Sequence, residues 1–509
     1  MAINTRNVLM KNLSWQFIFE KFDTKKFSYV LVILGVVFPV FQYLSNRSLW
    51  LDEAYLVQSF TRDYAGLLKP LEADQVAPIL FLWVVKFFST LIPDSEYGLR
   101  LFPLFCYLAS FYFFYQLVWL LIQNSYARLF AMTLFVFNSN LIYFASELKQ
   151  FIVDVLVVTM TYYLLLRPYR NPIYRYYLLA FAGILAIGFS NVTPLILFSV
   201  GMYFIYQGIQ QGDLQLKKLI PLFLLWLLAF AFYYINFIHD HPLKDFMIGY
   251  WSRKKAFMPL DVFSKEFLSF VIEKYKMIFK GLLTMGIISI LPLSVLYLYG
   301  LVTVVRRKHI PIFVLLTFPL ILHLILSGFE MYPFHLRLVL YFIPLVLLTL
   351  AFGIENILNF CAHNNFSKFS VFRNVFLLIP ILWVMFGLKI FIKGFPIKKE
   401  EIKKSIRYIE NNAAKTDQLF IHHSAWNAYN YYNYTGFVNH NLLTHIGSDS
   451  IDYEEYSKVF SKLKGRVWIL FTRENEKKRI IMMLERNAKR LDEFTTFNSS
   501  AYLYDFSAK

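Results

Sequence analysis

Long apolar runs separated by short polar segments fill most of the chain, up to about residue 395. A helix that crosses a bilayer needs roughly 17–25 apolar residues, and about eleven runs approach or reach that length. The pattern therefore predicts a polytopic α-helical membrane protein with about 11 transmembrane helices. The predicted spans are 29–45, 99–122, 129–145, 151–166, 176–190, 194–208, 219–238, 280–304, 310–327, 337–358 and 374–392.

Two of these runs meet at Asn191–Pro194, where the alternative is a single long helix with a proline kink. Arg175 precedes the pair, and Lys217 and Lys218 follow it. Because cytoplasmic loops are enriched in Lys and Arg, both flanks are expected on the cytoplasmic side. Two crossings satisfy that requirement and one does not.

The same rule predicts the sidedness of the whole chain. Residues 1–28 form a cytoplasmic leader, 29–395 a transmembrane domain, and 396–509 an extracytoplasmic domain. Two large loops, 46–98 and 239–279, are also expected on the outer face. The predicted location is the inner (plasma) membrane of a bacterium, since the bias toward Asn, Lys, Phe and Tyr is typical of an AT-rich genome.

Residues 396–509 change in character from the apolar runs before them. Helices are expected at 400–412, 453–463 and 474–484, and short buried strands at 419–421 and 467–471. Alternating helices and strands predict a small α/β domain with a partly parallel sheet. Both cysteines, Cys106 and Cys361, lie outside this region, which excludes an internal disulfide there.

Composition agrees with a membrane protein and excludes a nucleic-acid-binding one. The chain is 58% hydrophobic, 19% aromatic and only 17% charged, with a formal net charge of +18. The positive charge lies in short clusters between apolar runs, as topology requires. No basic stripe or nucleic-acid-binding motif is present.

The most informative polar feature is the acid pair Asp52-Glu53, directly after the first span. Carboxylates beside a bilayer are costly to bury and suited to acid–base or metal chemistry. The alternative is a structural pair that complements the dipole of a helix N-terminus. Position alone does not decide between the two.

Three cations are candidate partners of an anionic substrate. Lys149 and Arg337 lie where predicted outer-face turns meet spans, and the alternative is that both anchor to lipid head groups. Arg100 is a third candidate, or a structural partner of Glu96. His239-Asp240-His241 is too short a pattern to indicate a metal site, and we predict no required metal.

Several segments, in order along the chain, resemble the GT-C glycosyltransferases. The likeness covers about residues 27–395. Within that superfamily it points to the protein O-mannosyltransferases, the aminoarabinose transferases of lipid A and bacterial family-39-like proteins. The similar segments are Leu51–Ala54, Asp74–Trp83, Asp94–Pro103, Ser146–Phe151, and Tyr332–Phe334 with Arg337 and Pro344.

The resemblance implies an inverting transfer of a sugar from a polyprenyl-phosphate donor to a hydroxyl acceptor on the outer face. Asp52 would be the general base, and Glu53 would orient the acceptor or Asp52. Lys149 and Arg337 would stabilise the leaving phosphate. The full set of implied substrate-binding residues is Lys149, Arg337, Arg100, His335, Gln75 and Tyr332. No cofactor is implied, and the acceptor (glycan, lipid or protein) is not specified; membrane lipids are the other expected partner.

The chain departs from these families in two places. Val76-Ala77-Pro78 stands where aminoarabinose transferases carry a basic residue before paired prolines, so one contact is missing or supplied elsewhere. The luminal domain of eukaryotic protein mannosyltransferases is absent. A transporter or flippase of a lipid-linked or envelope precursor is the main alternative, and an inactive scaffolding relative is another. Polar residues gathered at one face favour the enzyme, since transporters place such residues near the midplane.

Overall fold

The computed structural model describes residues 23–284, 290–363, 394–440, 442–447, 453–473 and 477–507. The predicted span 374–392 and most of the predicted leader lie outside these residues. The chain forms two compact units. One comprises Met1–Val40, Pro103–Ala145 and Gln150–Gly394, and the other comprises Phe41–Phe102, Ser146–Lys149 and Phe395–Lys509. We call them the helical unit and the loop-and-sheet unit.

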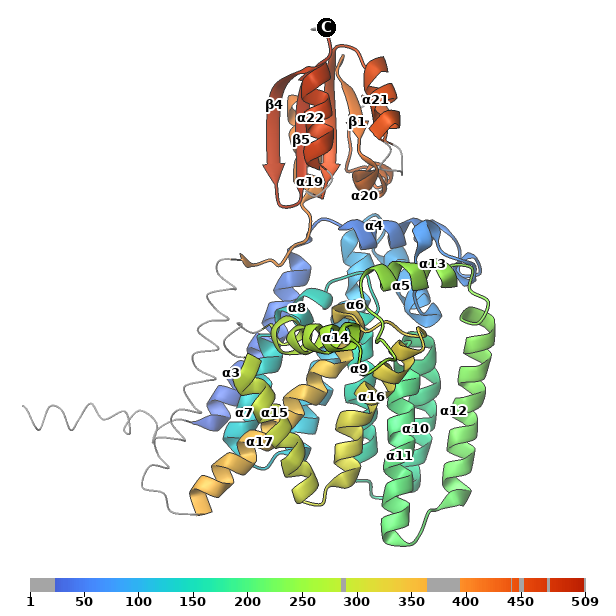
Figure 1. Cartoon of the computed structure of the whole chain (residues 1–509), viewed down its shortest axis with the longest axis vertical. Helices are drawn as coiled ribbons and strands as arrows, with labels where there is room; N and C mark the ends of the chain where they lie inside the picture. Colours follow the sequence, from blue (N-terminus) through green and yellow to red (C-terminus); the bar gives the residue numbers. More distant parts are fainter. Residues whose placement is uncertain are drawn as a thin grey trace, which may run out of the picture. The chain divides into compact units, whose positions relative to one another are not determined.

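The helical unit is a bundle of apolar helices (Figure 1). Two helices, α3 (Thr24–Leu44) and α6 (Glu96–Leu121), pass from one unit into the other. The remaining elements are α7 (Ser125–Val136), α8 (Ser139–Phe144), α9 (Phe151–Leu166), α10 (Ile173–Phe189), α11 (Thr193–Gln211), α12 (Leu216–Phe237), α13 (Lys244–Arg253), α14 (Lys265–Lys276), the π-helix η4 (Met277–Leu282), α15 (Ile290–Arg306), α16 (Ile310–Gly328), the 3₁₀ helix η6 (Leu336–Phe342) and α17 (Ile343–His363).

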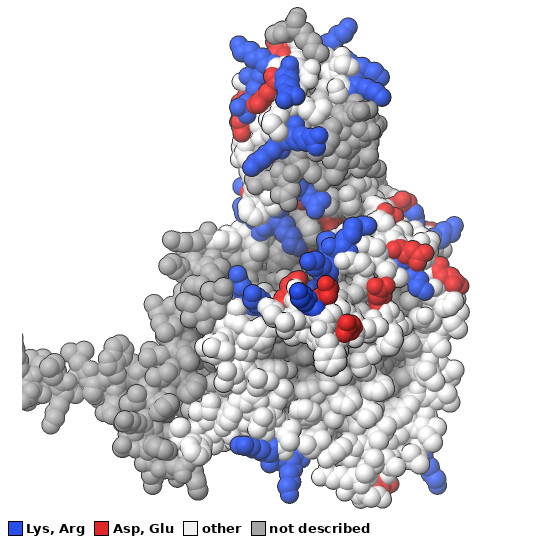
Figure 2. All heavy atoms as spheres, viewed as in Figure 1, with Lys and Arg blue, Asp and Glu red and all other residues white. Residues whose placement is uncertain are grey.

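Length and apolarity make this a multi-pass membrane protein. Among the described residues, five helical stretches are long and apolar enough to cross a bilayer, and five further apolar helices are shorter. Figure 2 shows a broad band of the helical unit with almost no charged side chain, and basic side chains at its lower edge. The total of 11 spans stays a prediction.

The structure divides one predicted span and keeps another pair separate. The run 129–145 is broken at Asn138, whose side chain accepts hydrogen bonds from Asn140 N and Leu141 N and so caps α8. Helices α10 and α11 are distinct, as predicted, with Pro194 in the first turn of α11, where its missing N–H costs no hydrogen bond.

The loop-and-sheet unit begins with the first loop and ends with an α/β domain. The loop contains α4 (Leu51–Val57), the 3₁₀ turns η1 (Gln58–Thr61), η2 (Gly66–Leu68) and η3 (Glu72–Asp74), and the helix α5 (Ile79–Leu91). The domain contains α19 (Ile402–Asn412), β1 (Gln418–Ile421), α20 (His423–Tyr434), β2 (Leu443–Ile446), α21 (Tyr453–Lys462), β3 (Arg466–Thr472), α22 (Lys477–Asn487), β4 (Lys489–Thr496) and β5 (Ser499–Asp505).

The sheet has the strand order β2-β1-β3-β5-β4 and is partly parallel, as predicted. Gln418 of β1 pairs in parallel with Leu443 of β2 and Val467 of β3, whereas Val467 pairs antiparallel with Tyr504 of β5. Buried aromatic and aliphatic side chains from β1, β3, β5, α21 and α22 form its core. Val467, Ile469 and Phe471 of β3 belong to that core, whereas Trp468, on the opposite face of the strand, packs against Tyr408 of α19. Because both of its faces are buried, β3 is continuously apolar.

Helix α20 connects the domain to the first loop. The Tyr432 hydroxyl accepts a hydrogen bond from Leu49 N at 2.8 Å and donates one to Glu96 Oε1 at 3.0 Å. Gln58 Nε2 donates to the carbonyl oxygen of Asn427 at 3.0 Å. These contacts place α20 against α4, the helix that carries the acid pair in its first turn.

Candidate functional site

The acid pair lies in the first turn of α4. Trp50 is the N-cap, and its backbone N–H donates to Glu53 Oε2 at 3.3 Å. A glutamate at the third helical position satisfies a backbone donor that the helix leaves unpaired. Both acids also complement the positive end of the helix dipole. Local sequence thus accounts for the start of the helix at this point.

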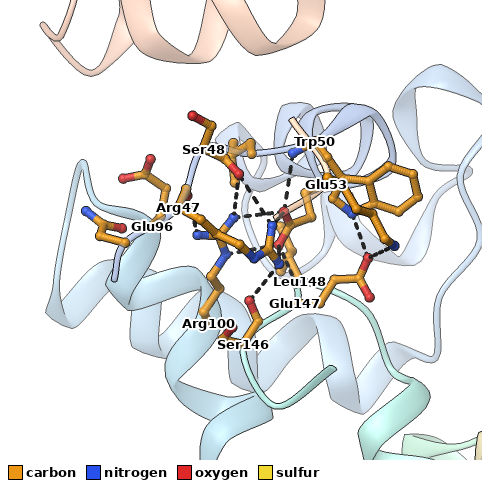
Figure 3. Close-up of polar contacts among 12 residues, drawn as sticks. Arg47, Ser48, Trp50, Glu53, Glu96, Arg100, Ser146, Glu147 and Leu148 are labelled. Atoms are coloured by element: carbon orange, nitrogen blue, oxygen red, sulfur yellow. Dashed lines mark hydrogen bonds and ion pairs between the residues drawn. The ribbon is translucent and has the colours of Figure 1, made fainter. Parts of the chain in front are cut away.

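Glu53 is fully buried between two arginines (Figure 3). Arg100 donates from Nε to Oε1 at 3.0 Å and from Nη2 to Oε2 at 2.8 Å, and Arg47 Nη1 donates to Oε2 at 2.7 Å. Burial alone would raise the pKa of Glu53. The charges and hydrogen bonds of Arg100 and Arg47 outweigh that effect and lower the pKa to about 2. Glu53 is therefore an anion throughout the physiological range.

The cluster around Glu53 also fixes the turn Ser146–Lys149. Arg47 Nη2 donates to the carbonyl oxygen of Ser146 at 2.9 Å, and Leu148 N donates to Glu53 Oε1 at 2.9 Å. Lys149 leaves this turn with its side chain buried, and its Nζ donates to Gln75 Oε1 at 2.6 Å. The structure thus brings Glu53, Arg100, Gln75 and Lys149, four of the predicted residues, into one unit.

Asp52, the fifth, is adjacent to Glu53 in sequence but lies in a different environment. Its side chain is partly exposed, whereas Glu53 is 0% exposed. The structure therefore gives the two acids different environments: Glu53 is buried and ion-paired, and Asp52 is partly exposed.

Sequence reasoning missed several members of this cluster. Glu147 is fully buried, and its Oε1 accepts from Trp50 Nε1 at 2.6 Å and from Lys399 Nζ at 3.1 Å. Glu96 pairs with Lys403 at 2.6 Å. Arg47 precedes the acid motif by a few residues, and nothing local marks it as a partner. For Glu147, the available signal in the sequence was an acidic residue within the segment Ser146–Phe151, which resembles the GT-C enzymes.

The other three predicted residues, Tyr332, His335 and Arg337, belong to the helical unit. Arg337, at the start of η6, lies over the rings of Trp251 at 5.4 Å and Phe151 at 5.6 Å. The His335 ring is 5.1 Å from that of Trp251. Burial, and then the charges of Arg337, Lys254 and Lys274, lower the pKa of His335 to about 4, so its imidazole is neutral at pH 7.

Asp154 is a further residue that sequence reasoning missed. It lies in the first turn of α9, is 2% exposed, and its Oδ1 accepts a hydrogen bond from Ser190 Oγ at 2.6 Å. An acid inside a membrane-spanning helix is costly, which makes it a candidate functional residue. The signal was present in the sequence, as one acidic residue inside the predicted span 151–166.

No group of three or more His, Cys, Asp and Glu side chains is arranged to hold a metal ion within the described residues. Metal independence nevertheless stays a prediction.

Comparison with known proteins gives a fold but no sequence relative. No protein-family model matches this sequence, and no curated protein sequence does. The fold is similar to that of ArnT from Cupriavidus metallidurans in the apo state, with a TM-score of 0.51 and 11% identity over 94% of this chain and 98% of that chain. A structure of the same ArnT bound to undecaprenyl phosphate has a TM-score of 0.48 and 12% identity over 94% and 97% of the two chains.

ArnT is a GT-C aminoarabinose transferase. The predicted architecture, a polytopic helical membrane protein with a small C-terminal sheet domain, is therefore confirmed, and its fold is similar to that of ArnT. At 11% identity the likeness establishes the fold, and the reaction has to be argued from the site.

Proposed function

We propose that this protein is an inverting glycosyltransferase that moves a sugar from a polyprenyl-phosphate donor to a hydroxyl acceptor. The observation that carries the proposal is the separation of the acid pair. Glu53 is an ion-paired anchor, and Asp52, one residue earlier, is partly exposed at the start of the same helix. A rigidly held helix with one accessible carboxylate is what a general base requires.

In the proposed reaction, the acceptor oxygen attacks the anomeric carbon while its proton passes to the carboxylate of Asp52. The bond between the anomeric carbon and the phosphate oxygen breaks, and its electron pair leaves with the polyprenyl phosphate. Attack opposite the leaving group inverts the anomeric centre. No nucleophilic residue or covalent intermediate is needed.

Lys149 is proposed to stabilise the leaving phosphate. A departing phosphate monoester is already anionic, so a cation serves it better than a proton does. The fixed turn Ser146–Lys149 holds the ammonium group with little conformational freedom to lose on binding. Gln75, bonded to Lys149, is proposed to hold that ammonium group in place. Arg337, Tyr332 and His335 remain predicted substrate-binding residues.

Sidedness completes the proposal. Positively charged loops between the spans support a topology with the N-terminus in the cytoplasm, and with the first loop and the C-terminal domain on the outer face of a bacterial plasma membrane. Donor and acceptor would both be reached there. The identity of the sugar and of the acceptor is open in this proposal.

The proposal is tested by transfer from a panel of donors. Membranes that contain the protein are supplied with radiolabelled pentoses, hexoses and N-acetylhexosamines linked to undecaprenyl phosphate, beside membranes that contain Asp52→Asn. Label that moves to an envelope component only with the intact acid supports the enzyme. Movement of intact donor across vesicles of purified protein, without any covalent product, would support the transporter instead.

A further inference from the structure

The α/β domain begins with a segment that runs along the first loop. We call Phe395–Lys403 the junction segment. Ile397 and Gln42 exchange two hydrogen bonds, of 2.7 and 2.9 Å, at its start. Lys403 Nζ bonds the carbonyl oxygen of Asn46 at 2.8 Å at its end, in addition to its pair with Glu96. The segment is thus bound at its start to the last turn of α3 and at its end to the loop that carries the acid motif.

The sheet holds the middle of the junction segment from the other side. Asn498 Nδ2, in the turn between β4 and β5, donates to the carbonyl oxygen of Lys399 at 2.9 Å. Glu401 N donates to the carbonyl oxygen of Phe497 at 3.0 Å, and the Glu401 carboxylate accepts from Thr496 Oγ1 at 2.8 Å. The backbone position of Lys399 is therefore set by the α/β domain.

The side chain of Lys399 points to two residues of the site. Its Nζ lies 3.1 Å from Glu147 Oε1 and 3.6 Å from the centre of the Trp50 ring. Glu147 is 0% exposed, and a buried carboxylate of this kind depends on its cationic and hydrogen-bonding partners. The aromatic face attracts the same ammonium group.

Both partners are two residues from a proposed reactive group. Trp50 caps α4 two positions before Asp52, and Glu147 precedes Lys149 by two positions. One ammonium group therefore joins the helix start that carries the base to the turn that carries the phosphate-binding cation. Because Trp50 Nε1 also donates to Glu147, the three side chains form a closed triangle.

We propose that Lys399 is a positioning residue of the transfer site, supplied by the C-terminal α/β domain. The inference rests on the proposed function. Lys399 acts through Trp50 and Glu147 and does not itself touch the reacting atoms. It gives the C-terminal domain a direct part in the reaction, namely to fix the relative placement of Asp52 and Lys149.

The kinetic test compares three full-length variants, assayed with the undecaprenyl-phosphate sugar that the wild-type protein uses. Lys399→Met keeps most of the stem but removes the charge, and a lower kcat by roughly 10- to 100-fold is expected, with the donor KM nearly unchanged. Lys399→Arg should restore most of kcat. Lys398→Met is the matched control, since the ion pair of Lys398 with Glu401 lies within the domain, and it should leave both constants unchanged.

A second measurement tests whether Lys399 stabilises the turn Ser146–Lys149, and it does not depend on activity. Amide hydrogen exchange is followed for the turn Ser146–Lys149, where Leu148 N bonds Glu53 and Lys149 N bonds the carbonyl oxygen of Glu147 at 2.7 Å. Exchange should rise several-fold in Lys399→Met and stay at the wild-type rate in Lys398→Met. Unchanged kcat together with unchanged exchange in Lys399→Met would overturn the role of Lys399.

The two proposals fail in different ways. A wild-type protein that uses no donor of the panel overturns the proposed function. The exchange measurement alone then shows whether Lys399 holds the turn Ser146–Lys149 in place. If the wild-type protein is active and Lys399→Met keeps both its kcat and its exchange rate, the positioning role alone is overturned.

Discussion

Arg100 holds Glu53 through two parallel hydrogen bonds, from Nε to Oε1 at 3.0 Å and from Nη2 to Oε2 at 2.8 Å. Paired bonds of this kind fix both the position and the orientation of a carboxylate. They join the entry of α6 to the first turn of α4. Glu53 thus links α4 to α6, and Asp52, the proposed base, lies one residue before it in the sequence.

Replacement of Glu53 by Gln is expected to destabilise the protein strongly. The change leaves two buried guanidinium groups without their anion, and breaking a buried ion pair costs about 3–5 kcal/mol. Thermal unfolding of the purified protein in detergent measures the loss as a lower apparent melting temperature.

The matched control for this prediction is Glu72→Gln in the same loop. Glu72 also pairs with an arginine, Arg62, but its side chain is 52% exposed. Exposed pairs contribute about 0–1 kcal/mol, so a small effect is expected. Equal effects of the two substitutions would contradict an anchoring role for Glu53.

The sequence indicated the acid motif as a candidate site but did not indicate which residues pair with Glu53. Hydropathy and charge specify which runs enter the membrane, because those properties are local. The pairing of Glu53 with both Arg47 and Arg100 depends on two segments that meet only in the folded chain, the start of the first loop and the entry of α6. No local pattern encodes such a meeting.

The C-terminal domain shows the same division. Strands β1 and β3 are apolar and were predictable from their composition. The edge strand β4 alternates exposed and partly buried residues, and the hairpin turn Phe497-Asn498 that joins it to β5 carries little turn signal beyond Asn498, whose φ is 52°. Helix α20 has weak amphipathic character because both the sheet and α4 contact it.

Glu400 gives a prediction on pH. It is 4% exposed, and burial raises its pKa to about 8, against the lowering effects of Arg473 and of a hydrogen bond from Leu51 N; Asp52 and Glu53 raise it further. The folded protein thus holds a proton there that the unfolded chain releases near pH 4.5. Stability is therefore expected to fall as pH rises from about 4.5 toward 8.

Glu400→Gln imitates the protonated acid and should remove that fall. The variant is expected to be as stable as the wild type at pH 5 and more stable at pH 8, by on the order of 1–3 kcal/mol. Melting temperatures measured at both pH values check it. A difference between the two proteins that does not change with pH would show that Glu400 is ionised in the folded state.

The buried carboxyl group of Asp154 is expected to support sugar transfer and to lower the stability of the folded protein. Asp154→Asn keeps the shape and an oxygen that can accept from Ser190 Oγ, but removes the carboxyl group that can gain and lose a proton. Sugar transfer should fall about 10-fold or more, while the melting temperature stays level or rises, as is usual for functional polar residues in buried positions. Full transfer by the variant would make Asp154 a structural residue.

Replacement of Arg337 is expected to change the KM for the donor more than the KM for the acceptor. Arg337→Ala should raise the donor KM about 10-fold or more and leave the acceptor KM within about twofold, since a lost charge-assisted contact to phosphate costs about 1.5–3 kcal/mol. Arg253→Ala, an exposed arginine at the end of α13, is the control. An unchanged donor KM would remove Arg337 from the predicted site.

The central claim, that Asp52 is the general base, is tested most directly by the transfer rate of Asp52→Asn at matched protein level, with the donor that the wild-type protein uses. The account predicts a loss of roughly 100-fold or more, as expected when a general base is removed, with an unchanged melting temperature. Wild-type transfer by a folded Asp52→Asn protein would contradict it.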